Sequence, residues 1–128
     1  MNTFVIIFRQ GPQTLTPADL QRRAEETSMW ARRQNEAGHK LDPHILAPAR
    51  ERRGAAIDDG AGIDTWPITA ILFLEARDLA EATNVGEQHP AIAYGANVEI
   101  RPWSSPAPVV GTTTPAPLAV ASQTPEVR

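Results

Sequence analysis

Three histidines, His39, His44 and His89, are the residues of this chain best suited to acid–base chemistry. A histidine ring titrates near neutral pH, so it can donate or accept a proton during a reaction. Asp42 lies two residues before His44, and in an extended segment this spacing places both side chains on one face. The carboxylate could then fix the tautomer of the ring, although a surface ion pair explains the same spacing. His89, His44 and Asp42 are therefore the catalytic candidates.

His89 follows an expected helix and precedes Pro90. The dipole at the end of a helix favours a protonated ring, so we expect a pKa near neutrality, as a general acid or base requires. The alternative is a histidine that only caps the last helix carbonyls. His39 and His44 are five residues apart, which puts them on opposite faces of an extended segment. We therefore expect no metal site.

Polar and aromatic side chains provide a second set of candidates, for ligand binding. Glu99 and Arg101 share one face of an expected strand, where Arg101 could hold a carboxylate or pair across the sheet. Tryptophan and tyrosine rings could line a cleft, but single aromatic residues more often belong to a core or an interface. The sequence has no Ser-His-Asp order, phosphate loop or nucleotide fingerprint, so we expect no cofactor. The ligand-binding candidates are Arg9, Trp30, His39, Tyr94, Glu99 and Arg101.

Composition limits the classes of protein to which the chain can belong. Its 128 residues suffice for one ordinary domain. Twelve basic and fifteen acidic residues give a formal charge of -3, which argues against a nucleic-acid partner. The absence of cysteine excludes disulfides and thiol nucleophiles and removes the usual sign of an oxidising compartment. The apolar run 4–8 is too short to span a membrane, so a soluble, cytoplasmic protein is expected.

The order of expected elements predicts an α+β domain over residues 1–103. Two helices are expected, one capped by Thr16 and stopped by Gly38, the other opened by a capping pair at Asp78 and Glu81 and closed before Pro90. The expected strands are a first strand at 4–8, an edge strand at 41–49, a weak arm at 55–57, a wholly apolar central strand at 69–76 and a final strand at 97–103. Without the weak arm this is a βαββαβ order, which suits two helices on one face of an antiparallel sheet.

Two features of the sequence bear on partners of the chain, namely the apolar strand 69–76 and the segment 104–128. Because the strand 69–76 is apolar on both faces, the face without helices would expose a large apolar patch, and a second copy of the chain is the simplest cover. Trp103, directly after the last strand, is the expected interface anchor. Residues 104–128 are rich in Pro, Ala and Thr, which predicts a disordered tail. Such a tail could instead dock on an aromatic groove of a partner.

Several segments resemble the YCII-related family. They are "FVIIFR", "AGHKLDPHILAP", "AILFLEARDLAEA" and the closing "HPAIAYGANVEIRPW", and together they extend the likeness from about residue 3 to residue 103. The resemblance implies a ferredoxin-like domain that pairs sheet to sheet as a dimeric α+β barrel. It also implies a cleft between sheet and helices, with a His-Asp pair in some members. A few relatives act as lyase- or isomerase-like enzymes on small molecules.

Two functions therefore compete at this stage. The first is a homodimeric lyase or isomerase that uses His89, or Asp42 with His44, for acid–base chemistry. The second is a dimeric, non-catalytic domain that binds a metabolite or serves as an accessory module. An enzyme needs a histidine in the pocket with a carboxylate or ligand in reach, whereas a binding domain needs only a shaped, mainly apolar cavity.

Overall fold

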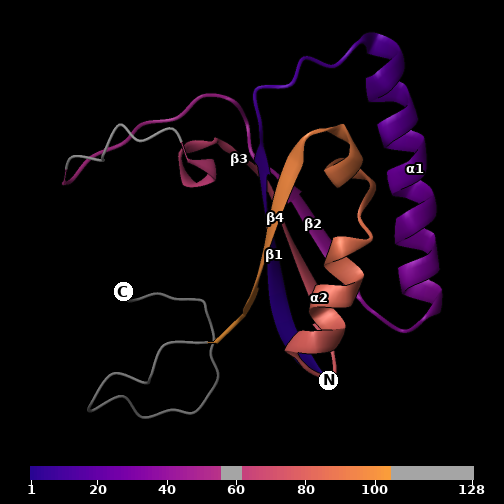
Figure 1. Ribbon diagram of the computed structural model, residues 1–128. Helices are drawn as coiled ribbons and strands as arrows, with labels where there is room; N and C mark the ends of the chain where they lie inside the picture. Colours follow the sequence, from indigo (N-terminus) through magenta and orange to yellow (C-terminus); the bar gives the residue numbers. More distant parts are fainter. Residues whose placement is uncertain (56–61, 105–128) are drawn as a thin grey trace, which may run out of the picture.

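The chain forms a four-stranded antiparallel sheet with two helices packed on one of its faces (Figure 1). The computed structural model describes residues 1–55 and 62–104. The strand order is β2-β3-β1-β4, which is the ferredoxin-like arrangement. The elements are β1 (Asn2–Gln10), α1 (Pro17–Glu36), β2 (Leu41–Ile45), β3 (Ile68–Ala76), α2 (Leu79–Glu87) and β4 (Ala96–Pro102), with short 3-10 helices η1 (Ile63–Thr65) and η2 (Pro90–Tyr94).

Local signals in the sequence fix both ends of α1. The Thr16 side chain accepts a hydrogen bond from the Asp19 backbone N–H, and the Asp19 carboxylate accepts one from the Thr16 N–H. These bonds satisfy backbone donors that the first helical turn leaves unpaired, so the expected capping box is confirmed. At the other end Gly38 has a φ of 95°, a left-handed conformation that favours glycine.

Asp78 begins α2, and His89 and Gly95 shape the junction between α2 and β4. Asp78 caps α2 by accepting a bond from the Glu81 N–H, while the Glu81 carboxylate accepts one from the Arg77 N–H. After α2, His89 leaves the helical conformation and η2 begins at the following proline. Gly95 ends η2 with a φ of 94°, and the chain enters β4. The expected break before Pro90 is thus confirmed.

The sheet has one covered and one uncovered face. Because side chains alternate along a strand, Phe4, Ile6 and Phe8 of β1 point toward the helices and join the buried core. Their neighbours Val5 and Ile7 point the other way, opposite Phe73 and Ile71 of β3. Figure 1 shows α1 and α2 on the same side of the sheet. We call the surface formed by Val5, Ile7, Ile71 and Phe73 the open face.

The structure confirms the expected α+β class, the central place of β3 and the edge position of β2. The strand expected at 41–49 ends earlier, at Ile45. The weak arm expected at 55–57 falls almost wholly outside the described residues, and so does the tail from residue 105 onward. No described helix is both long and apolar enough to cross a lipid bilayer.

Candidate functional site

The main cavity of the described region lies between α1 and the covered face of the sheet. Its volume is about 560 Å³, within the usual range for small-molecule sites. Residues of α1, β1, β2 and β3 and of the junction at His89 and Ala91 form the walls. α1 contacts η2 and, to a smaller extent, β2.

Most of the cavity wall is apolar, and its few polar groups carry more positive than negative charge. Alanine and larger aliphatic side chains from α1 and the strands supply most of the surface. Among the described residues, no aspartate or glutamate lines it, and Arg23 is the only lining side chain with a permanent charge. The polar or titratable lining residues are Gln10, Arg23, Thr27, Asn35, His44, Thr69 and His89.

His89 lines the cavity, but it differs from the expectation of a protonated ring at a helix end. Its Nδ1 accepts a hydrogen bond from the Ala91 N–H at 3.0 Å, so the ring caps the start of η2 rather than the end of α2. The ring packs edge-on against Phe8 and Trp30, with centroid distances of 4.7 and 4.6 Å. Burial, and then the positive charge of Arg23, lower the pKa of His89 from 6.5 to about 4. The expected pKa near neutrality is therefore wrong.

The hydrogen bond to Nδ1 also fixes the tautomer of His89. A ring nitrogen that accepts a hydrogen bond carries no proton, so the proton of the ring lies on Nε2. Nε2 has no hydrogen-bond partner among the described residues. At neutral pH this histidine can therefore donate a hydrogen bond from Nε2, but it cannot take up a proton there.

Trp30 is a core residue as well as part of the cavity wall. Its side chain is fully buried, and its indole nitrogen has no hydrogen-bond partner within residues 1–55 and 62–104. The indole ring holds one side of the His89 ring. Both expectations for a tryptophan, core anchor and cleft lining, apply to this residue.

Arg23 is a cavity residue that sequence reasoning missed. It lies on α1 and lines the cavity, and its charge acts on His89. None of the ion pairs within the described part of the chain involves it. In the sequence Arg23 is one of several charged residues of a helix that looks solvated, and only its place near the cavity distinguishes it.

Asp42 and His44 form the pair that their spacing predicts, but away from the interior of the cavity. The distance between His44 Nε2 and Asp42 Oδ2 is 3.1 Å, and both side chains are at least half exposed. The His44 ring packs edge-on against Phe73, which belongs to the open face. His44 thus borders the cavity from β2 while its ring lies on the other side of the sheet. The interpretation as a surface ion pair fits this geometry.

Three further candidates lie together on the open-face side of the sheet. Arg9 of β1 donates a hydrogen bond to Glu99 of β4 at 2.8 Å, and Arg101 approaches the same carboxylate at 3.9 Å. Glu99 and Arg101 therefore share a face, as expected, and the pairing across strands is present. Arg9 Nε is buried and has no partner among the described residues.

The remaining candidates, His39 and Tyr94, have structural contacts outside the cavity lining. His39 is buried just before β2, where its Nδ1 lies 3.0 Å from the Glu75 carbonyl oxygen. Tyr94 of η2 donates a hydrogen bond to the Glu26 carboxylate of α1 at 3.2 Å. This bond helps to attach α1 to the junction.

Within the described residues, no group of three or more histidines and carboxylates is arranged to hold a metal ion. No protein-family model matches the chain, and no curated protein matches it. The function must therefore be argued from the cavity and from the two faces of the sheet.

Proposed function

We propose that this chain is a YCII-like domain that binds a small, mainly apolar molecule in the cavity between α1 and the sheet. The observation that carries the proposal is the cavity itself, which is large enough for a metabolite and has mostly aliphatic walls with few polar groups. The resemblance of the closing block "HPAIAYGANVEIRPW" to YCII-related proteins supports the same place for a ligand. A cytoplasmic location stays a prediction.

The chemistry of His89 favours binding over acid–base catalysis. A general base must accept a proton, but Nδ1 is engaged with the Ala91 N–H and Nε2 already carries the proton. No carboxylate from the described part of the chain lines the cavity to support an imidazolium ion. Asp42 and His44, the other catalytic candidates, pair on the surface of an edge strand. The described residues therefore meet the requirements of a binding site more closely than those of an acid–base enzyme.

A substitution at the cavity tests the binding function. Ala24 lines the cavity from α1 but is exposed, so Ala24→Trp should fill the mouth without disturbing the core. In a thermal-shift screen of small apolar metabolites, we expect some compounds to raise the Tm of the wild type and none to raise that of Ala24→Trp. Ala18→Trp, at an exposed position of the same helix outside the cavity, should respond like the wild type. Ligands that bind equally well to Ala24→Trp would refute this site.

A lyase or isomerase is the second candidate function, because His89 lines the cavity and presents an N–H donor. Such a donor could stabilise an oxyanion without transferring its proton. Incubation of each bound compound with the protein, followed by mass spectrometry or NMR, separates the two functions. Recovery of unchanged compounds supports the binding domain. Conversion that His89→Asn abolishes, while binding persists, supports the enzyme.

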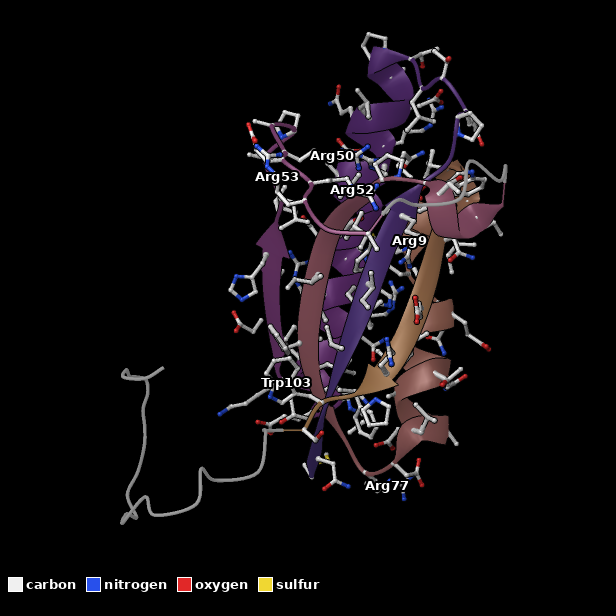
Figure 2. All side chains as sticks on the ribbon, turned by 90° about the vertical axis from the view of Figure 1, so that its left-hand side faces the viewer. Arg9, Arg50, Arg52, Arg53, Arg77 and Trp103 are labelled. Atoms are coloured by element: carbon white, nitrogen blue, oxygen red, sulfur yellow. The ribbon has the colours of Figure 1, made fainter. Side chains whose placement is uncertain are left out.

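We further propose that the open face pairs with the same face of a second copy, which would form the α+β barrel expected from the resemblance. Val5, Ile7, Ile71 and Phe73 are neighbours across the two central strands; Val5 is buried and the other three are partly exposed. Trp103 extends the open face, since its ring packs edge-on against Phe73 with a centroid distance of 5.0 Å. Figure 2 views this side of the sheet, with Arg9 toward one end and Trp103 toward the other.

Charge substitutions on the two sides of the sheet test the dimer. We expect the wild type to sediment as a dimer at micromolar concentration, and Trp103→Glu and Phe73→Glu to sediment as folded monomers, because a carboxylate in an apolar interface loses its hydration. Met29→Glu provides the control, since Met29 is exposed on α1. Trp103→Glu keeps the test valid if Phe73→Glu fails to fold. A wild-type protein that sediments as a monomer would contradict the proposal.

A further inference from the structure

Two side chains that line the cavity carry hydrogen-bond donors for which the described residues provide no acceptor. The first is His89 Nε2, whose proton is fixed there by the bond between Nδ1 and the Ala91 N–H. Unlike the indole nitrogen of Trp30, Nε2 is not among the fully buried polar atoms that lack a partner, so the cavity can supply its acceptor. The second donor is the guanidinium group of Arg23, which forms no ion pair within the described residues.

The cavity differs from a purely apolar pocket because its wall carries a charge. Within residues 1–55 and 62–104, Arg23 gives the wall its single permanent positive charge, and no carboxylate of the lining balances it. Arg23 and His89 are close enough for the charge to act on the ring. A cation would find repulsion here and no acceptor of opposite charge. An anion would find a cation and a neutral N–H donor on a mainly apolar wall.

From this arrangement we infer that the ligand is a small organic monoanion whose apolar body lies against the aliphatic wall and whose charged oxygen is bound by Arg23 and His89 Nε2–H. The inference rests on the proposed binding function and specifies its ligand class, a carboxylate or enolate. Only one charge is matched, because one arginine is present. A dianion would leave a second charge against apolar walls, which costs free energy.

Trp30 acts as a positioning residue in this site. Its indole packs edge-on against the His89 ring, and Phe8 packs against the same ring. Together with the backbone bond to Nδ1, these contacts hold the ring in one orientation. The donor is therefore placed before the ligand arrives, which reduces the entropy lost on binding.

Three probes of nearly equal shape test the inference by isothermal titration calorimetry. They are cinnamate, cinnamamide and cinnamylamine, which carry a negative, a neutral and a positive end group. We expect cinnamate to bind most tightly, cinnamamide about tenfold more weakly because it loses the charge-assisted bond, and cinnamylamine least. Competition with the compounds found by thermal shift would place the probes in the same cavity.

Variants assign the effect to individual residues. Arg23→Gln should raise the Kd of cinnamate about tenfold and change that of cinnamamide by less than about twofold, since only the charge is lost. Arg32→Gln is the matched control, because Arg32 is exposed on the same helix and does not line the cavity. His89→Asn should weaken both cinnamate and cinnamamide, because each presents a carbonyl oxygen to Nε2–H. The asparagine oxygen can still accept the bond from the Ala91 N–H.

The outcomes separate this inference from the proposed function. If all three probes bind with equal affinity, or if Arg23→Gln leaves the preference for cinnamate unchanged, selectivity for an anion is refuted while a binding cavity is retained. If cinnamylamine binds most tightly, the assignment of charge is wrong. If none of the three binds to the wild type, the inference is overturned, and the thermal-shift screen with Ala24→Trp still decides the binding function.

Discussion

Trp30→Ala is expected to lower the free energy of unfolding by about 3–5 kcal/mol, the largest loss that we expect from a single substitution in this domain. The Trp30 side chain is fully buried, with a relative exposure of 0 %. Its removal would take away the contact with His89 and leave space next to a cavity that already exists. Since small domains are stable by only about 5–15 kcal/mol, the variant should lie near the limit of folding.

Chemical denaturation followed by circular dichroism measures this loss. Met29→Ala is the matched control, because Met29 is the neighbouring residue of α1 and is exposed, so its replacement should change stability by less than about 0.5 kcal/mol. Trp30→Phe retains a large ring and should fall between the two. If Trp30→Ala were as stable as Met29→Ala, Trp30 would not be the anchor between α1 and the sheet.

The fold could be predicted because its signals are local. Thr16 and Asp19 are three residues apart, and this spacing alone defines a capping box whose two hydrogen bonds are present. The apolar run at 69–76 marked the central strand, and the alternation of Val98 and Ile100 with polar residues marked the two faces of β4. Each signal lies within a few residues, so no knowledge of distant contacts was needed.

The site could be predicted only in part, because burial arises between segments that are far apart in the sequence. His89 was identified as a candidate, but its ring is enclosed by Phe8 of β1 and Trp30 of α1, which are 81 and 59 residues away along the chain. Proximity to Pro90 predicted the break in the helix. It did not predict that the His89 ring would accept a hydrogen bond from the Ala91 N–H. Arg23 was missed for the same reason, since its position over the cavity depends on how α1 lies on the sheet.

Asp42 and His44 show the opposite case. Their local pattern predicted the geometry of the pair correctly but did not predict its function. The spacing predicted a pair on one face of a strand, and the pair is present. The sequence predicted that the strand lies at the edge of the sheet, but not that the His44 ring lies on the open-face side with Phe73. A catalytic pair and a surface pair have the same spacing, and only the surroundings distinguish them.

Acidification should destabilise the protein through His89. The pKa of His89 is about 4 in the folded chain against an ordinary value of 6.5, so the unfolded chain binds more protons between these two values. Stability linked to this residue is therefore fully present above pH 6.5, falls as the pH decreases toward 4, and changes no further below it. The total loss is about 3 kcal/mol, because one pKa unit corresponds to about 1.4 kcal/mol.

Carboxylates also titrate at the lower end of this range, so the measurement compares two proteins rather than two pH values alone. The free energy of unfolding of the wild type minus that of His89→Asn should decrease by about 3 kcal/mol between neutral pH and pH about 4, since the variant retains the carboxylates and the bond from the Ala91 N–H. A constant difference between wild type and His89→Asn would mean that the ring takes up protons as readily in the folded state as in the unfolded one. The cavity would then be wet enough to hydrate an imidazolium ion, and acid–base catalysis by His89 would regain its physical basis.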